Sequence, residues 1–167
     1  MHKLIVILES EDLSLIRKPN YECFLADSSL PEKVLQSLSR EIKACHKLLL
    51  LMGENACALC KQYNADGVLF DASKSEHCVK EVNFARKQIG DKVLGVISRN
   101  RRHEAMLISE CEPDFVAFKV WEQGKEQTKE LVAWYTEMFL IQSAVIPQEK
   151  ISDIEQFECD IVIQSIQ

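Results

Sequence analysis

Short apolar runs recur along the chain at a nearly constant spacing. Most of them do not alternate apolar with polar residues, which is typical of strands that are buried on both faces of a sheet. The eight runs cover residues 4–8, 23–25, 47–52, 67–70, 93–97, 115–120, 139–146 and 160–166. The pattern therefore predicts eight short, buried strands with short connecting elements between them.

Several of the segments between these runs place apolar residues at helical spacing, in one stripe along each segment. These segments are residues 31–45, 75–89, 126–138 and 148–157. Two of the predicted helices carry a capping-box signal, formed by Ser29 with Glu32 and by Ser73 with Glu76. In this motif the hydroxyl and the carboxylate bind the unpaired amide groups of the first helical turn.

Eight strand–helix units joined by short loops predict an α/β protein with parallel strands and right-handed crossovers. An open, doubly wound sheet is one possibility. A compact (β/α)8 TIM barrel is favoured, because there are eight units and no strand has the polar pattern of a sheet edge. The first helix is expected to be short, near residues 12–17, with no helix after strand eight. Residues 1–167 form one predicted domain.

Without an eighth helix, strands eight and one lack an outer cover. Both strands carry apolar residues, including Leu4, Val6, Leu8, Ile161 and Ile163. The outward-facing members of this set need a partner, or they form an exposed patch. We therefore expect a homodimer through the side of strands eight and one. The alternative is that neighbouring helices lean over the gap.

Composition narrows the possible functions. The formal net charge of −6 argues against nucleic-acid binding, which needs a basic face. The apolar runs are too short for a membrane span, and the seven cysteines without framework spacing favour the reducing cytoplasm. The five glycines lie too far apart for a Gly-rich phosphate loop.

Several segments resemble the thiamine phosphate synthase family, which includes the TenI-type proteins. Residues 64–68 read Asn-Ala-Asp-Gly-Val, residues 92–98 read Lys-Val-Leu-Gly-Val-Ile-Ser, and residues 112–116 read Glu-Pro-Asp-Phe-Val. In the family these places typically read GADGV, IIGVS and GADYI. Residues 24–32 and 143–147 also lie where the family has its QLREKDLPE and GGI motifs, so the resemblance extends in order along the chain.

The resemblance implies a (β/α)8 barrel that couples a pyrimidine pyrophosphate to a thiazole phosphate with Mg²⁺, a transferase reaction of thiamine biosynthesis. The sequence departs from the family at several functional positions, and the paired glycines of the GGI motif become Ala144 and Val145. Retained coupling activity is therefore one reading. The other is a non-catalytic barrel that binds a phosphorylated small molecule or a protein partner.

Polar residues follow several of the predicted strands and are therefore candidates for a site at the barrel mouth. If the family activity is retained, the resemblance assigns the site to residues at the strand ends, with Asp71 facing the magnesium ion. These residues are Asp27, Asn55, Asp71, Ser98 and Lys119. Glu9 or Glu11 and Glu54 are further acids that could converge there. Ordinary polar loop ends are the alternative.

A dense basic cluster follows the fifth predicted strand, with Arg99, Arg101 and Arg102 around Asn100. Cations at the start of a helix oppose its macrodipole, which favours an anionic partner for the three arginines. The alternative is a solvated loop with Asn100 as the N-cap. Cys57 and Cys60 form a CxxC pair, for which packing in the core is favoured over a redox or metal role.

Overall fold

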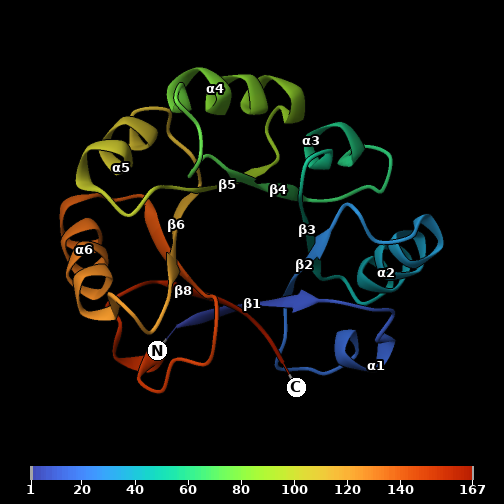
Figure 1. The fold of residues 1–167 in the computed structure, drawn as a ribbon. Helices are drawn as coiled ribbons and strands as arrows, with labels where there is room; N and C mark the ends of the chain where they lie inside the picture. The colour runs from blue at the N-terminus through green and yellow to red at the C-terminus, as the bar shows by residue number, and fades with distance from the viewer. Residues whose placement is uncertain (1, 167) are drawn as a thin grey trace.

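The computed structural model describes residues 2–166 and shows a closed barrel of eight parallel strands in the order in which they occur in the chain (Figure 1). The strands are β1 (Lys3–Leu8), β2 (Cys23–Asp27), β3 (Leu48–Met52), β4 (Gly67–Asp71), β5 (Val93–Ile97), β6 (Phe115–Val120), β7 (Gln142–Pro147) and β8 (Ile161–Ser165). Each predicted run overlaps one of them, so the predicted (β/α)8 barrel is confirmed.

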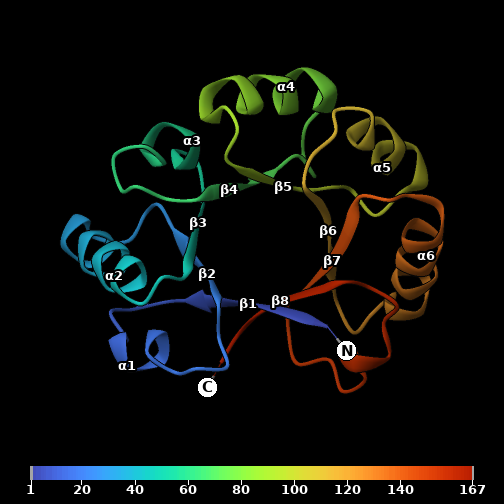
Figure 2. The ribbon, with the colours of Figure 1, turned by 180° about the vertical axis from the view of Figure 1, so that it is seen from behind.

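Helices surround the barrel and cover the outer faces of the strands, as the view from behind also shows (Figure 2). They are α1 (Leu13–Ile16), α2 (Glu32–Ala44), α3 (Ala56–Leu59), α4 (Cys78–Ile89), α5 (Arg102–Ser109) and α6 (Lys125–Met138). The prediction of a short first helix is confirmed. Among residues 2–166, no helix is long and apolar enough to cross a membrane.

The predicted helix over residues 148–157 is wrong, because this segment forms a single 3₁₀ turn, Ile154–Gln156. Two contacts explain the difference. The Nζ atom of Lys125 lies 3.0 Å from Oδ1 of Asp153 and ties the segment to α6. Ile151 and Phe157 are both buried in the cluster that packs the helices against the strands, so the segment covers part of the outside of the barrel.

Two apolar cores lie on the two sides of the strand wall. The outer core packs the helices against the strands and includes Leu38, Ile42, Val82 and Tyr135. The inner core fills the barrel lumen with side chains from all eight strands. Its buried members are Ile5, Leu25, Leu50, Leu69, Ile97, Phe115, Ala117, Ala144, Ile146, Ile161 and Ile163. The lumen is therefore packed with side chains, as in other barrels of this class.

Strands β8 and β1 pair directly, with Lys3 opposite Ile161, and so close the ring. The outward-facing residues Val6, Leu8 and Val162 are at most 4% exposed, and they belong to the outer core. The exposed apolar patch that motivated a dimer through this side is therefore not present among the described residues. That dimer stays a prediction without this support.

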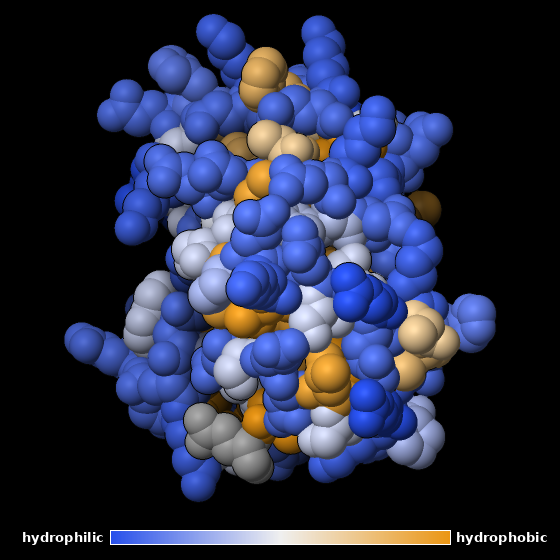
Figure 3. Space-filling view, turned by 90° about the vertical axis from the view of Figure 1, so that its right-hand side faces the viewer, coloured by the Kyte–Doolittle hydropathy of each residue, from blue (hydrophilic) through white to orange (hydrophobic). Residues whose placement is uncertain are grey.

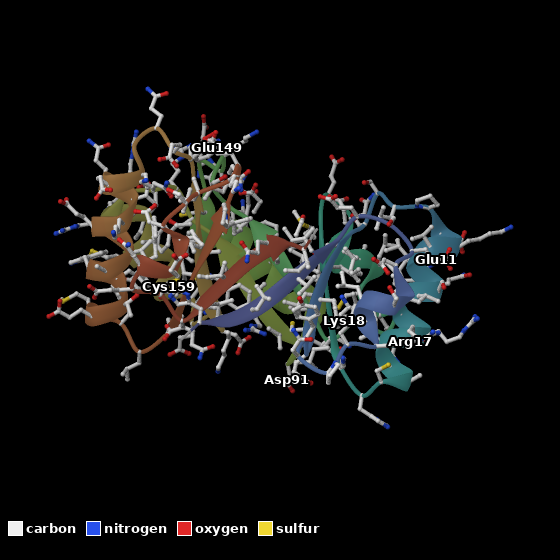
Figure 4. All side chains as sticks on the ribbon, turned by 90° about the horizontal axis from the view of Figure 1, so that it is seen from below. Glu11, Arg17, Lys18, Asp91, Glu149 and Cys159 are labelled. Carbon is white, nitrogen blue, oxygen red and sulfur yellow. The ribbon has the colours of Figure 1, made fainter. Side chains whose placement is uncertain are left out.

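The two ends of the barrel can be recognised in Figure 4. Glu11 and Glu149 follow β1 and β7 and lie towards one end, whereas Lys18 and Asp91 precede β2 and β5 and lie towards the other. The face over α1, α2 and α3 is mostly hydrophilic, with small apolar patches between polar side chains (Figure 3). The carboxyl ends of the strands lie at the end of the barrel with Glu11 and Glu149.

Candidate functional site at the barrel mouth

A cavity of about 580 Å³ opens at the carboxyl ends of the strands, and we call it the mouth. Barrels of this class place their binding residues at this end, where the loops after the strands meet. The floor of the mouth is apolar and consists of Ile7, Leu25, Met52, Leu69, Ile97 and Ile146. The polar side chains around it include Glu9, Asp27, Lys119, Gln148 and Ser165.

Lys119 and Asp71 form an ion pair at the edge of the mouth. They are inward-facing residues at the ends of β6 and β4, and the Nζ atom of Lys119 lies 3.1 Å from Oδ2 of Asp71. The other carboxylate oxygen of Asp71 accepts hydrogen bonds from the backbone N–H and the hydroxyl of Ser73, at 2.9 and 2.6 Å. Burial alone raises the pKa of Asp71, but the bonds from Ser73 and Lys119 outweigh it and hold this pKa below its ordinary value.

Asp27 ends β2 in a turn of the same type. Its Oδ1 atom accepts a hydrogen bond from the backbone N–H of Ser29 at 2.8 Å, and Oδ2 makes no hydrogen bond to another described residue. The loop after β3 comes very close to this turn. A Cβ atom on Gly53, where φ is +107°, would lie 2.9 Å from Oδ1 of Asp27, so the turn requires glycine. Asp27 thus presents one carboxylate oxygen for a ligand.

The ends of strands β1 and β8 add a third acid, Glu9, to the mouth. The hydroxyl of Ser165 donates to Oε1 of Glu9 at 3.1 Å. On the neighbouring strand, the side-chain amide of Gln148 donates to the backbone carbonyl of Ile146 at 3.0 Å. The described polar side chains around the mouth therefore comprise three carboxylates, one ammonium group, one amide and two hydroxyls. This arrangement favours hydrogen-bond donors and positive charge in a ligand.

The residues at Asp71 do not fit the Mg²⁺ ion that the family resemblance implies. Both carboxylate oxygens of Asp71 are already bonded, and the Lys119 ammonium occupies the position where a cation would approach. Magnesium needs several oxygen ligands in near-octahedral geometry. Within the described part of the chain, no three His, Cys, Asp or Glu residues are grouped so that they could hold a metal ion.

Two of the five predicted site residues lie outside the mouth. Ser98 is 2% exposed, and its hydroxyl donates to the carbonyl of Arg99, because the residue after inward-facing Ile97 points away from the lumen. Asn55 lies beside α3 and lines a separate groove, together with Glu54. Of the predicted set, the structure brings together Asp27, Asp71 and Lys119.

The three arginines of the basic cluster do not converge on one point. The Nε atom of Arg99 donates to the carbonyl of Ser73 at 2.7 Å, whereas the guanidinium of Arg102 lies 4.7 Å from the ring centre of Trp134 on α6. Arg101 is exposed and occupies the N-cap position of α5. Arg99 therefore supports the Ser73 turn that holds Asp71, and an anion site at the three arginines stays a prediction.

Sequence reasoning missed Ser165, Gln148 and the role of Ser73. One signal could have indicated the last of these, because Asp27 and Asp71 are each followed two positions later by a serine. An aspartate at a strand end commonly binds the backbone two residues further on. Ser165 and Gln148 carry no comparable local signal, since only closure of the ring brings β8 beside β1.

The structure thus defines an eight-stranded α/β barrel with an apolar-floored, carboxylate-rich mouth. Comparison of the sequence with protein-family models and with curated proteins finds no match. The resemblance to thiamine phosphate synthases therefore stays a prediction that rests on the segments quoted above.

Proposed function

We propose that the protein is a thiamine phosphate synthase-like barrel that binds a flat, amino-substituted heterocycle at its mouth and does not carry out the coupling reaction. The observation that supports this proposal is the pairing of an apolar floor with a rim of carboxylates. The pyrimidine half of the family's substrates has this chemistry, with an apolar ring face and amine donors at its edge.

The floor suits a planar ring. Leu25, Leu69 and Ile97 are at most 2% exposed and lie at the base of the cavity. A ring placed on them takes its own apolar face out of water, at about 25 cal/mol for each Å² that is buried. Small-molecule sites usually combine such an apolar surface with a few polar groups that fix the orientation of the ligand.

The rim suits amine donors better than phosphate. Oδ2 of Asp27 and the carboxylate of Glu9 accept hydrogen bonds, and the charge of Lys119 is already balanced by Asp71 at 3.1 Å. Ala144 and Val145 replace the family's paired glycines and pair with Ile161 and Val162 in the sheet, so their backbone groups belong to the ladder. The arginines that could neutralise a pyrophosphate point elsewhere.

The cysteines support the predicted cytoplasmic location as part of this proposal. All seven carry free thiols, and four of them are partly exposed to solvent. Free thiols persist in a reducing compartment, whereas an oxidising one favours disulfides.

Isothermal titration calorimetry tests the proposal with a hydroxymethyl aminopyrimidine, its pyrophosphate ester and thiazole phosphate, each with and without Mg²⁺. We expect the aminopyrimidine alcohol to bind without Mg²⁺ and the other two compounds to bind more weakly. We expect Asp27→Asn to weaken binding about tenfold or more, since a hydrogen bond to a charged group contributes about 1.5–3 kcal/mol. Asp91→Asn is the matched control, because Asp91 lies towards the opposite end of the barrel.

Two results would overturn the proposal. One is Mg²⁺-dependent formation of thiamine phosphate with release of pyrophosphate, which would show that the coupling reaction is retained. The other is equal binding by the wild type and Asp27→Asn, which would place the ligand away from the mouth.

A further inference from the structure

A second and larger hollow, of about 850 Å³, lies outside the barrel between α3 and α4. The two helices are neighbours in the ring but differ in length (Figure 1). Helix α3 has 4 residues and α4 has 12, so α3 covers only part of the side of α4 that faces it. We call this hollow the α3/α4 groove; its lining includes Asn55, Cys57, Ala58, Phe70, His77 and Phe84.

An exposed aromatic residue marks the groove. Phe84 on α4 is 63% exposed, whereas the other stripe of the same helix, which includes Val82 and Ala85, is buried against the barrel. Phe70 is half-buried and lies at the same groove, beside Cys57. An exposed phenyl ring beside an apolar hollow is typical of a surface that another molecule covers.

The charges along α4 are arranged around Phe84. Glu81 lies three residues before it and Lys87 lies three residues after it, and all three side chains are exposed and line the groove. When two copies of such a helix pack antiparallel about a twofold axis at Phe84, Glu81 of each copy faces the partner's Lys87. The helix surface is therefore complementary in charge to itself.

We propose that the α3/α4 groove is a homodimer interface, in which α4 of a second copy lies antiparallel to α4 and the two Phe84 rings meet at the twofold axis, over the apolar lining of the groove. Because of the twofold axis, the ion pair between Glu81 of one copy and Lys87 of the other occurs twice. Lys80 then faces the partner's Gln88, whose amide oxygen accepts a hydrogen bond from an ammonium group.

The local contacts leave these groups available. Ser75 donates its hydroxyl to Oε2 of Glu81, which leaves Oε1 for a partner, and Lys87 forms no ion pair with another described residue. A parallel arrangement of the two helices would oppose like residues, placing Glu81 against the partner's Glu81. Like charges that face each other destabilise a pair, so charge alone selects the antiparallel arrangement.

Charge reversal tests this arrangement in the full-length chain by analytical ultracentrifugation. The wild type is expected to show a concentration-dependent monomer–dimer equilibrium. Glu81→Lys and Lys87→Glu each place like charges together twice, so each should weaken dimerisation about tenfold, which corresponds to about 1.4 kcal/mol. The double variant Glu81→Lys/Lys87→Glu restores both pairs with reversed sign and should dimerise like the wild type.

Mixing the two single variants gives the sharpest result. In the mixed dimer, lysine at position 81 faces glutamate at position 87 on one side, and the native Lys87 faces the native Glu81 on the other. The mixture should therefore associate with about wild-type affinity, although each variant alone associates weakly. A mixture that associates no better than its components overturns the antiparallel pairing.

A second pair of variants distinguishes association through this surface from non-specific hydrophobic association. Phe84→Asp should abolish the dimer and leave the circular dichroism spectrum unchanged, because the side chain is already exposed. Leu140→Asp is the control, since Leu140 is 105% exposed in the loop between α6 and β7. A monomeric wild type at all accessible concentrations overturns the proposal, as does a dimer that survives Phe84→Asp.

Discussion

The two ends of this barrel are built differently. At the amino-terminal end, Asp66, Asp114 and Asp160 precede β4, β6 and β8, and each accepts a hydrogen bond from a backbone N–H of the preceding strand, at 2.7 to 2.9 Å. Lys47 and Lys92 bind backbone carbonyls in the same region. At the mouth, Asp27 and Asp71 bind their own turns instead.

The difference separates stability from binding. Side chains at the amino-terminal end connect strand to strand, so removing one leaves a buried backbone group without a partner. At the mouth, Asp27 and Asp71 organise the turns that carry them, through Ser29 and Ser73. Barrels of this class usually carry stability at the amino-terminal end and function at the other, and the hydrogen bonds of these aspartates differ between the same two ends.

The largest expected loss of stability comes from a substitution in the inner core of the barrel. A Cβ atom on Gly95 would lie 2.1 Å from the ring of Phe115, its neighbour on β6, which is 3% exposed. Gly95→Ala should therefore lower the free energy of unfolding by about 3 kcal/mol, because the packed lumen leaves the ring little space to move. Urea denaturation followed by circular dichroism measures the change.

The double variant Gly95→Ala/Phe115→Leu controls for this explanation. The smaller leucine side chain removes the clash, so the double variant should be more stable than Gly95→Ala alone. An equal or lower stability of the double variant would show that the cost of alanine has another source.

The second effect compares the two ends directly. Asp160→Ala removes the acceptor of the Ser143 N–H and should cost about 2 kcal/mol, because that amide group is left unpaired beside the buried Ser143. Asp27→Ala leaves the N–H of exposed Ser29 free to bind water and should cost less than about 1 kcal/mol. Equal losses in urea denaturation would remove the distinction between the ends.

The smallest expected effect is on the pH dependence of stability at acidic pH. The pKa of Asp71 is held below its ordinary value of 3.8, so its ionised form stabilises the folded state. This contribution is fully present above the ordinary pKa and is lost as the pH falls through the lower, folded-state value. Wild-type stability should therefore fall more steeply than that of Asp71→Asn between about pH 5 and about pH 2. Parallel pH profiles for the two proteins would contradict the shift.

The strands and their closure into a barrel could be predicted from the sequence because buried strands leave a local record in every apolar run. The two predicted capping boxes are wrong, although helices form in both segments. Helix α2 begins with Pro31 as its N-cap and has no side-chain cap, and the N–H of Ser29 binds Asp27 instead. Likewise, α4 has His77 as its N-cap, and Ser73 binds Asp71. In both places the serine that the capping box assigned to the helix forms a hydrogen bond to the strand-end aspartate instead.

The candidate site was predicted in part for a related reason. Asp27, Asp71 and Lys119 end strands at inward-facing positions, which a strand count reveals. Asn100 was a candidate N-cap, but its side-chain amide donates to the carbonyl of Lys119 across to the next strand. Contacts of this kind depend on which loops become neighbours in the fold. The hydrophobic periodicity of the sequence does not predict which loops these are.

The pairing of β1 with β8 also determines when the barrel is completed during protein synthesis. Lys3 is synthesised well before its partner Ile161, which follows only after the seven other strands. Until then β1 and β7 are both open edges, with unpaired backbone groups of the kind that promotes aggregation. Contacts between such distant segments also slow folding. The incomplete barrel is therefore exposed to aggregation at two strand edges until β8 closes the ring.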